Sequence, residues 1–277
     1  MNVQQGDNVK LGDNVKLGDN VKLGDNVKLG DNVKLGDNVK LGDNVIIDDY
    51  TQVLSNSIVG SNSYVGTFCK RGEVGIDYAN PDYKGTIIGE NALIRSNTII
   101  YSETQIGDNF QSGHRVTIRE KAKIGKNVRI GTLSDIQGDC VIGDYVNLHS
   151  NVHIGQKSII ENYVWIFPYT ILTNDPTPPS NILLGITVKK FAVIAAATTI
   201  LPGVIIGEDT LVGANTLVSK NVEKGTVVVG NPMKEIGNID RMKNKLTGES
   251  VYPWRYNFDR GMPWEKIGYD EWRKSNK

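Results

Sequence analysis

Three histidines are the side chains of this sequence best suited to proton transfer near neutral pH. They are His114 in SGHRV, His149 in LHSNV and His153 in VHIGQ. A neutral imidazole can accept the proton of a hydroxyl group that is too weakly acidic to ionise alone. General base catalysis on a small hydroxyl or amino substrate is therefore the chemistry that these residues could support.

Other kinds of site are not indicated. The sequence holds no P-loop, no GxGxxG, no Ser-His-Asp set and no metal-binding cluster of His and Cys. Lys and Arg number 31 and Asp and Glu also number 31, so there is no charge footprint for nucleic acid or an anionic membrane. We expect a soluble, cytoplasmic protein without a secretion signal or membrane span.

A six-residue repeat dominates the chain. GDNVKL occurs six times without change from residue 6 to residue 41. Its register continues in VGSNSY at 59, IGDNFQ at 106, IGKNVR at 124, IGDYVN at 142, IGQKSI at 154 and IGEDTL at 206. Two apolar positions per hexad, separated by Gly and Asn, do not form a helical stripe. They favour short strands joined by tight corners, because Gly and Asn tolerate positive φ.

This pattern resembles the hexapeptide repeat of left-handed parallel β-helices, where three hexads make one triangular coil. The resemblance implies an all-β fold whose core holds the bulky position of each hexad: Leu11, Leu17, Leu23, Leu29, Leu35 and Leu41. Cys69 and Cys140 take the smaller apolar position, that of Val15, so we expect both in the core rather than in a disulfide or a metal site.

Stacking of coils three hexads long has consequences for the perfect repeats. It places Asp13 over Asp31 and Lys16 over Lys34, so like charges lie about 4.8 Å apart. Identical repeats carry no position-specific side chain, and no site is assigned to them. Their uniformity fits either a recent natural expansion or deliberate engineering, and the sequence leaves both open.

Two segments interrupt the repeat, at about 70–86 (KRGEVGIDYANPDYKGT) and 173–187 (TNDPTPPSNILLGIT). We predict idealised coils over 1–45, a β-helix carrying these two loops over 46–232, and a tail over 233–277. Loops on a rigid solenoid commonly carry binding and catalysis, although inert insertions are the alternative.

The tail differs from the repeats in composition. Ile236, Ile239, Met242 and Leu246 have the spacing of a short amphipathic helix, which Gly237 weakens. VYPWRYNFDRGMPWEKIGYDEW, from 251 to 272, holds three of the four tryptophans. We expect these aromatic side chains to pack on the surface or on a neighbouring subunit; stacking on a sugar is the alternative.

The coil period also relates the histidines. His114 and His149 are 149 − 114 = 35 residues apart, one short of two coils. A strand spacing of about 4.8 Å puts them roughly 10 Å apart along the axis. His153 takes an outward position, where we expect a solvated side chain.

Residues 106–237 further resemble the acetyl-CoA-dependent sugar acetyltransferases of the hexapeptide family, especially those that N-acetylate nucleotide-linked amino sugars. The matching stretches are SGHRV, NLHSNVHIGQKSIIENYVWIFPYTILTND, VKKFAVIAAATTILPGVIIG and VGNPMKEIG. The resemblance implies transfer of an acetyl group from acetyl-CoA to an amino or hydroxyl group of a sugar, most of all a nucleotide-linked sugar for surface polysaccharide. N- and O-acylation both stay open.

The resemblance gives the site residues their expected roles. His114 is the candidate base and His149 the alternative; Asn174 either orients the acceptor or the base, or caps a loop turn. Backbone N–H groups commonly stabilise the oxyanion in such reactions.

The resemblance also implies that the pantetheine arm lies between two subunits of a homotrimer. Small residues would permit its close approach: Ala195, Ala196, Ala197 and Gly213. Four lysines are candidates for contact with the CoA phosphates, or else are simply solvated: Lys189, Lys190, Lys220 and Lys224.

Functions of another class are a non-catalytic scaffold, including an engineered repeat protein or an ice binder, and a degenerate acyltransferase fold that only binds. An ice binder presents ranks of Thr or other modestly polar groups, whereas the outward residues of GDNVKL are strongly hydrated Asp and Lys. A passive rod also gives no purpose to the loops and His114. An acyltransferase is therefore our first interpretation.

Overall fold

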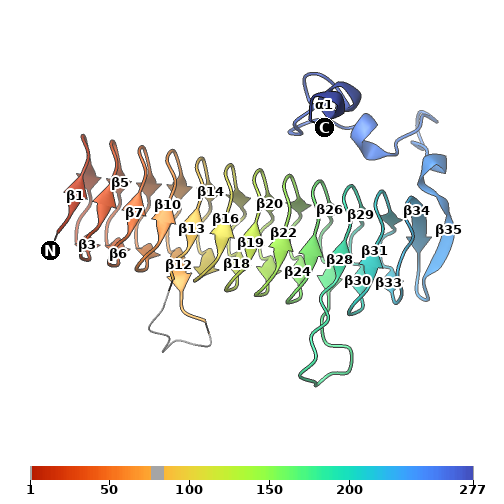
Figure 1. The fold of residues 1–277 in the computed structure, drawn as a ribbon, viewed down its shortest axis with the longest axis horizontal. Helices are drawn as coiled ribbons and strands as arrows, with labels where there is room; N and C mark the ends of the chain where they lie inside the picture. Colours follow the sequence, from red (N-terminus) through yellow and green to blue (C-terminus); the bar gives the residue numbers. More distant parts are fainter. Residues whose placement is uncertain (1, 76–83, 277) are drawn as a thin grey trace.

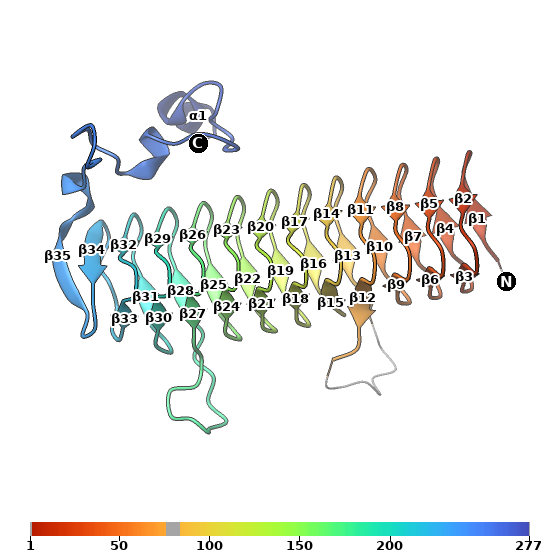
Figure 2. The same cartoon turned by 180° about the vertical axis from the view of Figure 1, so that it is seen from behind.

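A computed structural model describes residues 2–75 and 84–276 and shows a left-handed parallel β-helix. Its coils form one long prism, with the amino-terminal coils at one end and strand β34 at the other (Figures 1 and 2). Three sheets form the sides of this prism, and each short strand pairs in parallel with the strand one coil further along. The fold class predicted from the hexad pattern is therefore confirmed.

The strands lie in three sheets, here named A, B and C. Sheet A holds β1 (Gln4–Gln5), β4 (Lys22–Leu23), β7 (Lys40–Leu41), β10 (Ile58–Val59), β13 (Ile87–Ile88), β16 (Gln105–Ile106), β19 (Lys123–Ile124), β22 (Val141–Ile142), β25 (Ile159–Ile160), β28 (Thr187–Val188) and β31 (Ile205–Ile206). Sheet B holds β2 (Lys10–Leu11), β5 (Lys28–Leu29), β8 (Ile46–Ile47), β11 (Tyr64–Val65), β14 (Leu93–Ile94), β17 (Gln111–Ser112), β20 (Arg129–Ile130), β23 (Asn147–Leu148), β26 (Trp165–Ile166), β29 (Val193–Ile194), β32 (Leu211–Val212), β34 (Thr226–Val229) and β35 (Lys234–Asn238). Sheet C holds β3 (Lys16–Leu17), β6 (Lys34–Leu35), β9 (Gln52–Val53), β12 (Lys70–Glu73), β15 (Ile99–Tyr101), β18 (Thr117–Ile118), β21 (Asp135–Ile136), β24 (His153–Ile154), β27 (Ile171–Leu172), β30 (Thr199–Ile200) and β33 (Leu217–Val218).

The chain passes from A to B to C and back to A, which creates three edges: A/B, B/C and C/A. The asparagine of each perfect hexad sits at a corner with φ of 56° to 58°, the left-handed region that Asn tolerates. In the two-residue strands the first residue faces out and the second faces the core, as Lys22 and Leu23 do. Leu11, predicted in the core, is 45% exposed, because it lies in the first coil at the open end of the prism. Cys69 and Cys140 are buried in that core as predicted, and burial raises the pKa of Cys140 to about 11.

Polar ladders stabilise the perfect repeats against the stacked charges. The strand register places Lys16 opposite Lys34, as the coil period predicts. The backbone N–H of Asp13 donates to Oδ1 of Asp31 at 2.7 Å. The carboxylate of one coil thus forms a hydrogen bond with the corner of the preceding coil. Because a backbone amide neutralises part of that charge, the aspartate stack costs less than bare repulsion between carboxylates.

Two excursions leave the helix at the C/A edge. One follows β12 and one follows β27. The second, at 173–186, projects from the side of the prism (Figures 1 and 2). Residues 76–83 of the first predicted loop lie outside the described part. In the second loop, Asp175 organises the turn by accepting hydrogen bonds from Ser180 N at 2.8 Å and Ser180 Oγ at 2.7 Å.

The amphipathic helix predicted around residues 236–246 is wrong. Residues 234–238 form strand β35, which pairs antiparallel with β34. Ile239 is buried, but Ile236 is exposed and Leu246 is 95% exposed, so the four residues do not form one buried apolar face. This segment forms a strand rather than a helix because β34 of the last coil has unpaired N–H and C=O groups, with which β35 forms hydrogen bonds. Beyond it lie η1 (Ile239–Arg241), η2 (Trp254–Tyr256) and helix α1 (Tyr269–Ser275).

Removing one coil of the perfect repeats, residues 12–29, is expected to preserve folding and activity. The deletion joins Leu11 to Gly30 and keeps the upstream residues on their sheets, because the deleted segment is one full coil of three hexads. Deletion of the single hexad 12–17 is the comparison, since it rotates residues upstream by a third of a turn. Circular dichroism and turnover measure both proteins, and loss of activity in the coil deletion would show that the array contributes to the site.

Candidate active site

His114 and His149 lie at the B/C edge and line one cavity of about 460 Å³. His114 follows strand β17, and His149 follows β23, two coils further along. The outer face of sheet B forms the floor of the cavity, with Gln111, Arg129 and Asn147 stacked one coil apart. The structure therefore brings together the two histidines that the sequence singled out.

The imidazole of His114 is held by a hydroxyl group. Its Nδ1 lies 2.7 Å from Oγ of Ser96, which sits in the preceding coil at the same edge. Ser96 can accept a hydrogen bond from Nδ1–H, and in that tautomer Nε2 keeps a free lone pair. Among the described residues Nε2 has no hydrogen-bond partner, so it is the nitrogen available to take a proton.

His149 has a more apolar environment. Its ring stacks on Phe167, with centroids 4.5 Å apart, and lies near Trp165 at 6.2 Å. Burial lowers the pKa of His149 below its usual value of 6.5, because no described group compensates for the lost hydration of the imidazolium. His149 is therefore a neutral, aromatic member of the wall at pH 7.

The titration of His149 should be visible in stability. Its folded pKa lies below the unfolded value of 6.5. As the pH falls through 6.5 the unfolded chain takes up this proton first, so the free energy of unfolding decreases until the folded imidazole is also protonated. An NMR titration, assigned with His149→Gln, should give a midpoint below 6.5, and this variant should lose less stability than the wild type between pH 7 and pH 5. A midpoint at or above 6.5 would contradict this account.

The carboxy-terminal tail supplies the remaining wall. Arg260 lines the cavity of the two histidines and also a second, apolar cavity of about 360 Å³ that adjoins it. His149 and Trp165 also line both cavities. Residues of the tail that line the apolar cavity are Tyr252, Trp254 and Phe258.

The tail is fixed to the helix by buried aromatic packing. Trp254 and Trp264 are buried against a cluster that includes Tyr163 and Phe191. The Nε1–H of Trp254 donates to the carbonyl of Phe191 at 2.9 Å. The tail thus packs on its own chain, one of the two positions that the sequence left open, and both ribbon views show it beside the middle and late coils (Figures 1 and 2).

The other predicted site residues are spread over different edges. Ala195, Ala196, Ala197 and Gly213 follow β29 and β32, on the B/C edge that carries both histidines. Asn174 lies at the neck of the loop on the C/A edge, where its carbonyl accepts from Leu184 N at 2.7 Å. Within one chain it does not reach the cavity of His114.

The four lysines also lie away from the cavity. On the A/B edge, Lys189 pairs with Glu161 at 2.8 Å, and Lys190 and Lys224 reach Glu208 at 3.7 and 3.2 Å. Lys220 follows β33 on the C/A edge and is exposed. Lys190, Lys220 and Lys224 are exposed and therefore accessible to an anionic ligand, and surface ion pairs of this kind contribute little to stability.

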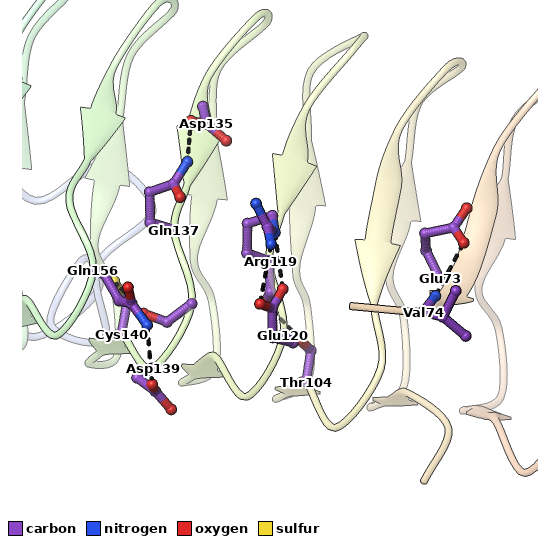
Figure 3. A network of polar contacts seen from close by, with 11 residues as sticks. Glu73, Val74, Thr104, Arg119, Glu120, Asp135, Gln137, Asp139, Cys140 and Gln156 are labelled. Carbon is purple, nitrogen blue, oxygen red and sulfur yellow. Dashed lines mark hydrogen bonds and ion pairs between the residues drawn. The ribbon is translucent and has the colours of Figure 1, made fainter. Parts of the chain in front are cut away.

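His153 belongs to a separate polar network on sheet C and the C/A edge. Its Nδ1 lies 3.1 Å from Oδ2 of Asp135, so it is paired rather than simply solvated. Burial raises the pKa of Asp135, but the hydrogen bonds from His153 and Gln137 outweigh this and hold the pKa low. Figure 3 shows Asp135 with Gln137 and, in neighbouring coils, Arg119 with Glu120. These groups satisfy one another and line none of the cavities described above.

Sequence reasoning missed several cavity residues. Arg129, Asn147 and Trp165 occupy outward positions one coil apart, so the period could have aligned them beside His114. The sequence could not have placed Arg260 in the cavity, because the tail has no repeat and contacts residues that are far away in the sequence.

Two properties of the described residues bear on the chemistry. No group of three or more His, Cys, Asp or Glu side chains there is arranged to hold a metal ion. None of the helices in that part of the chain is long and apolar enough to cross a membrane.

Three family models match parts of the chain. Residues 2–106 match the GMPPB C-terminal domain, residues 121–156 match the bacterial transferase hexapeptide (six repeats), and residues 203–231 match the hexapeptide repeat of succinyl-transferase. The first hexapeptide match includes Arg129 and His149 of the cavity but not His114, and the second follows the second loop.

Curated relatives are similar in sequence to part of the chain. The chain is 33% identical over 122 residues to dTDP-4-amino-4,6-dideoxy-D-glucose acyltransferase of Escherichia coli, covering 42% of this chain and 58% of the relative. It is 34% identical over 112 residues to YvoF of Bacillus subtilis (strain 168), which carries an acetyltransferase assignment, covering 40% and 58%. The chain thus spans somewhat over half the length of these relatives.

Among solved structures, LpxA of Bacteroides fragilis 9343, a UDP-N-acetylglucosamine acyltransferase, is 19% identical with a TM-score of 0.37, over 83% of this chain and 72% of that one. A variant of perosamine N-acetyltransferase from Caulobacter crescentus, in complex with CoA and GDP-perosamine, is 19% identical with a TM-score of 0.36, over 53% and 57%. Similarity at this level carries no argument about function. Residues 121–156 thus match the hexapeptide repeat of bacterial transferases, and part of the chain is similar in sequence to curated acyltransferases.

Proposed function

We propose that this protein transfers an acetyl group from acetyl-CoA to an amino or hydroxyl group of a sugar. The observation that carries the proposal is the pairing of His114 with Ser96, which leaves one imidazole nitrogen free beside a polar cavity. The sequence similarity to acyltransferases, one of them acting on a dTDP-linked amino sugar by its name, supports the same reaction class.

The reaction needs few groups from the protein. Nε2 of His114 accepts the proton of the attacking hydroxyl or amine as its oxygen or nitrogen bonds to the thioester carbonyl carbon. The tetrahedral intermediate then collapses, the carbon–sulfur bond breaks, and the imidazolium returns its proton to the departing CoA thiolate. Ser96 keeps the imidazole in one orientation during both transfers, and the acetylated sugar and CoA thiol are the products.

The donor is expected along the B/C edge. Ala195, Ala196, Ala197 and Gly213 continue the edge of the histidines and leave room for the pantetheine arm. The lysines and Asn174 lie on other edges of the same chain, so they can join this site only from a neighbouring copy. We therefore also propose a homotrimer with sites between subunits, acting in the cytoplasm, where acetyl-CoA is available.

A product assay tests this function. The protein is incubated with acetyl-CoA and, separately, with nucleotide-linked amino sugars and with simple hydroxyl sugars. Mass spectrometry should show the gain of one acetyl group in at least one acceptor, and sedimentation should show a trimer. Absence of product across the panel would favour the non-catalytic scaffold or binding module, and a monomer would exclude sites between subunits.

A further inference from the structure

The tail and the outer face of sheet B line two adjoining open cavities of different chemistry. The apolar cavity is walled by Trp165, Trp254 and Phe258, whose rings meet edge to face with centroids 5.5 to 6.3 Å apart. Its volume of about 360 Å³ is enough for a planar heterocycle. Aromatic walls of this kind favour stacking with a flat ring.

The polar cavity is cationic. Arg95, Arg129 and Arg260 line it together with the two histidines. Among the described residues, Arg119 and Arg255 have carboxylate partners, whereas these three arginines have none within ion-pair distance. Arg95 donates to the carbonyl of Ser112 at 2.7 Å, which fixes it without neutralising it. Three unneutralised guanidinium groups around one cavity favour a phosphate or diphosphate ligand.

Arg260 links the two cavities. It lines both of them, and its guanidinium carbon lies 5.7 Å from the ring centroid of Phe258. An anion bound by Arg260 therefore sits next to the aromatic walls. The neighbouring Gly261 brings the tail against Arg129, whose Nη2 lies 3.4 Å from the position that a Cβ of residue 261 would take.

We propose that residues 252–260 of the tail complete an acceptor subsite for a nucleoside diphosphate. The base stacks in the apolar cavity, and the diphosphate contacts Arg129 and Arg260. This inference rests on the proposed function and narrows its acceptor to a nucleotide-linked sugar bound by the tail. Arg260 becomes a specificity-determining residue of that site.

The same ligand chemistry occurs in CoA, which also joins a base to a diphosphate. Geometry favours the acceptor, because the arginines share their cavity with His114. In a nucleotide sugar the diphosphate is bonded directly to the sugar that must reach this base. In acetyl-CoA the whole pantetheine arm separates the diphosphate from the thioester, so its phosphates lie far from the reacting carbon.

Calorimetry with free nucleotides tests the subsite. The probes are UDP, dTDP and GDP on one side and acetyl-CoA on the other. Arg260→Gln should weaken the Kd of the nucleoside diphosphate that binds by about tenfold or more, since a charge-assisted hydrogen bond is lost. The Kd of acetyl-CoA should stay within about twofold. Arg273→Gln, an exposed arginine of α1 that lines neither cavity, is the matched control and should change neither.

Each other outcome is decisive. If Arg260→Gln weakens acetyl-CoA and leaves the nucleotides unchanged, the subsite belongs to the donor and the inference is wrong. It is also wrong if none of the three nucleotides binds the wild type at millimolar concentration. Acetyl transfer to an unlinked sugar that Arg260→Gln does not slow would leave the proposed function standing without this subsite. Nucleotide binding that depends on Arg260, without any acyl transfer, would support the subsite and contradict the proposed function.

Discussion

Replacing His114 with alanine is expected to lower kcat by about 10²-fold or more. The variant loses the free imidazole nitrogen, so a hydroxyl acceptor must give up its proton to water during attack. The loss should be smaller for an amine acceptor, which is already nucleophilic. Binding of acetyl-CoA should change little. Steady-state turnover with the acceptor found above measures the effect.

The matched control for this variant is His153→Ala. His153 is bonded to Asp135 on sheet C and lines no cavity with His114. Its replacement should leave kcat within about twofold. Thermal unfolding should be nearly unchanged in His114→Ala, because the side chain is exposed at a corner. An unaltered rate in His114→Ala would refute its role as the base and would move attention to His149.

Replacing Arg255 with alanine is expected to release the tail from the helix. Arg255 forms an ion pair with Asp209, and the two side chains are only 13% and 8% exposed. The guanidinium also lies 4.5 Å from the ring centroid of Phe191. Burial lowers the pKa of Arg255, but Asp209 outweighs it and the net shift is upward. Removing one partner of a buried pair costs about 3–5 kcal/mol, because the other charge is left desolvated.

Hydrogen exchange measures the loss of stability in the tail separately from that of the helix. Amides of residues 252–272 should exchange about 10²–10³-fold faster in Arg255→Ala, while those of the central coils keep their protection. Adding Asp209→Asn removes the stranded charge and should recover part of the protection. Arg273→Ala, on the exposed face of α1, serves as the control. Tail exchange within about threefold of the wild type would show that the aromatic cluster alone holds the tail.

The helix was predictable because its contacts repeat with the sequence. Each strand pairs with the one three hexads away unless a loop intervenes, so the place of a residue in its hexad fixes its sheet and its direction. That logic placed Cys69 and Cys140 in the core and His114 and His149 on one edge. It also placed Lys16 opposite Lys34.

The position of the tail could not be predicted from the repeat period. Its contacts join residues far apart in sequence, such as Trp254 and Phe191 at a separation of 63 residues, and no period relates them. The failed helix around 236–246 has the same origin. Spacing alone favoured a helix, but the open edge of β34 decided the conformation. The pairing of His153 with Asp135 was within reach of the period, since the two residues lie one coil apart.

The rate of CoA thiol release from acetyl-CoA is the most direct test of the central claim. It is compared with and without acceptor, in the wild type and in His114→Ala. If His114 is the base of acyl transfer, release depends on a sugar acceptor, saturates with it, and falls about 10²-fold or more in the variant. Release that ignores the acceptor, or that is equal in both proteins, would contradict acyl transfer at this edge of the helix.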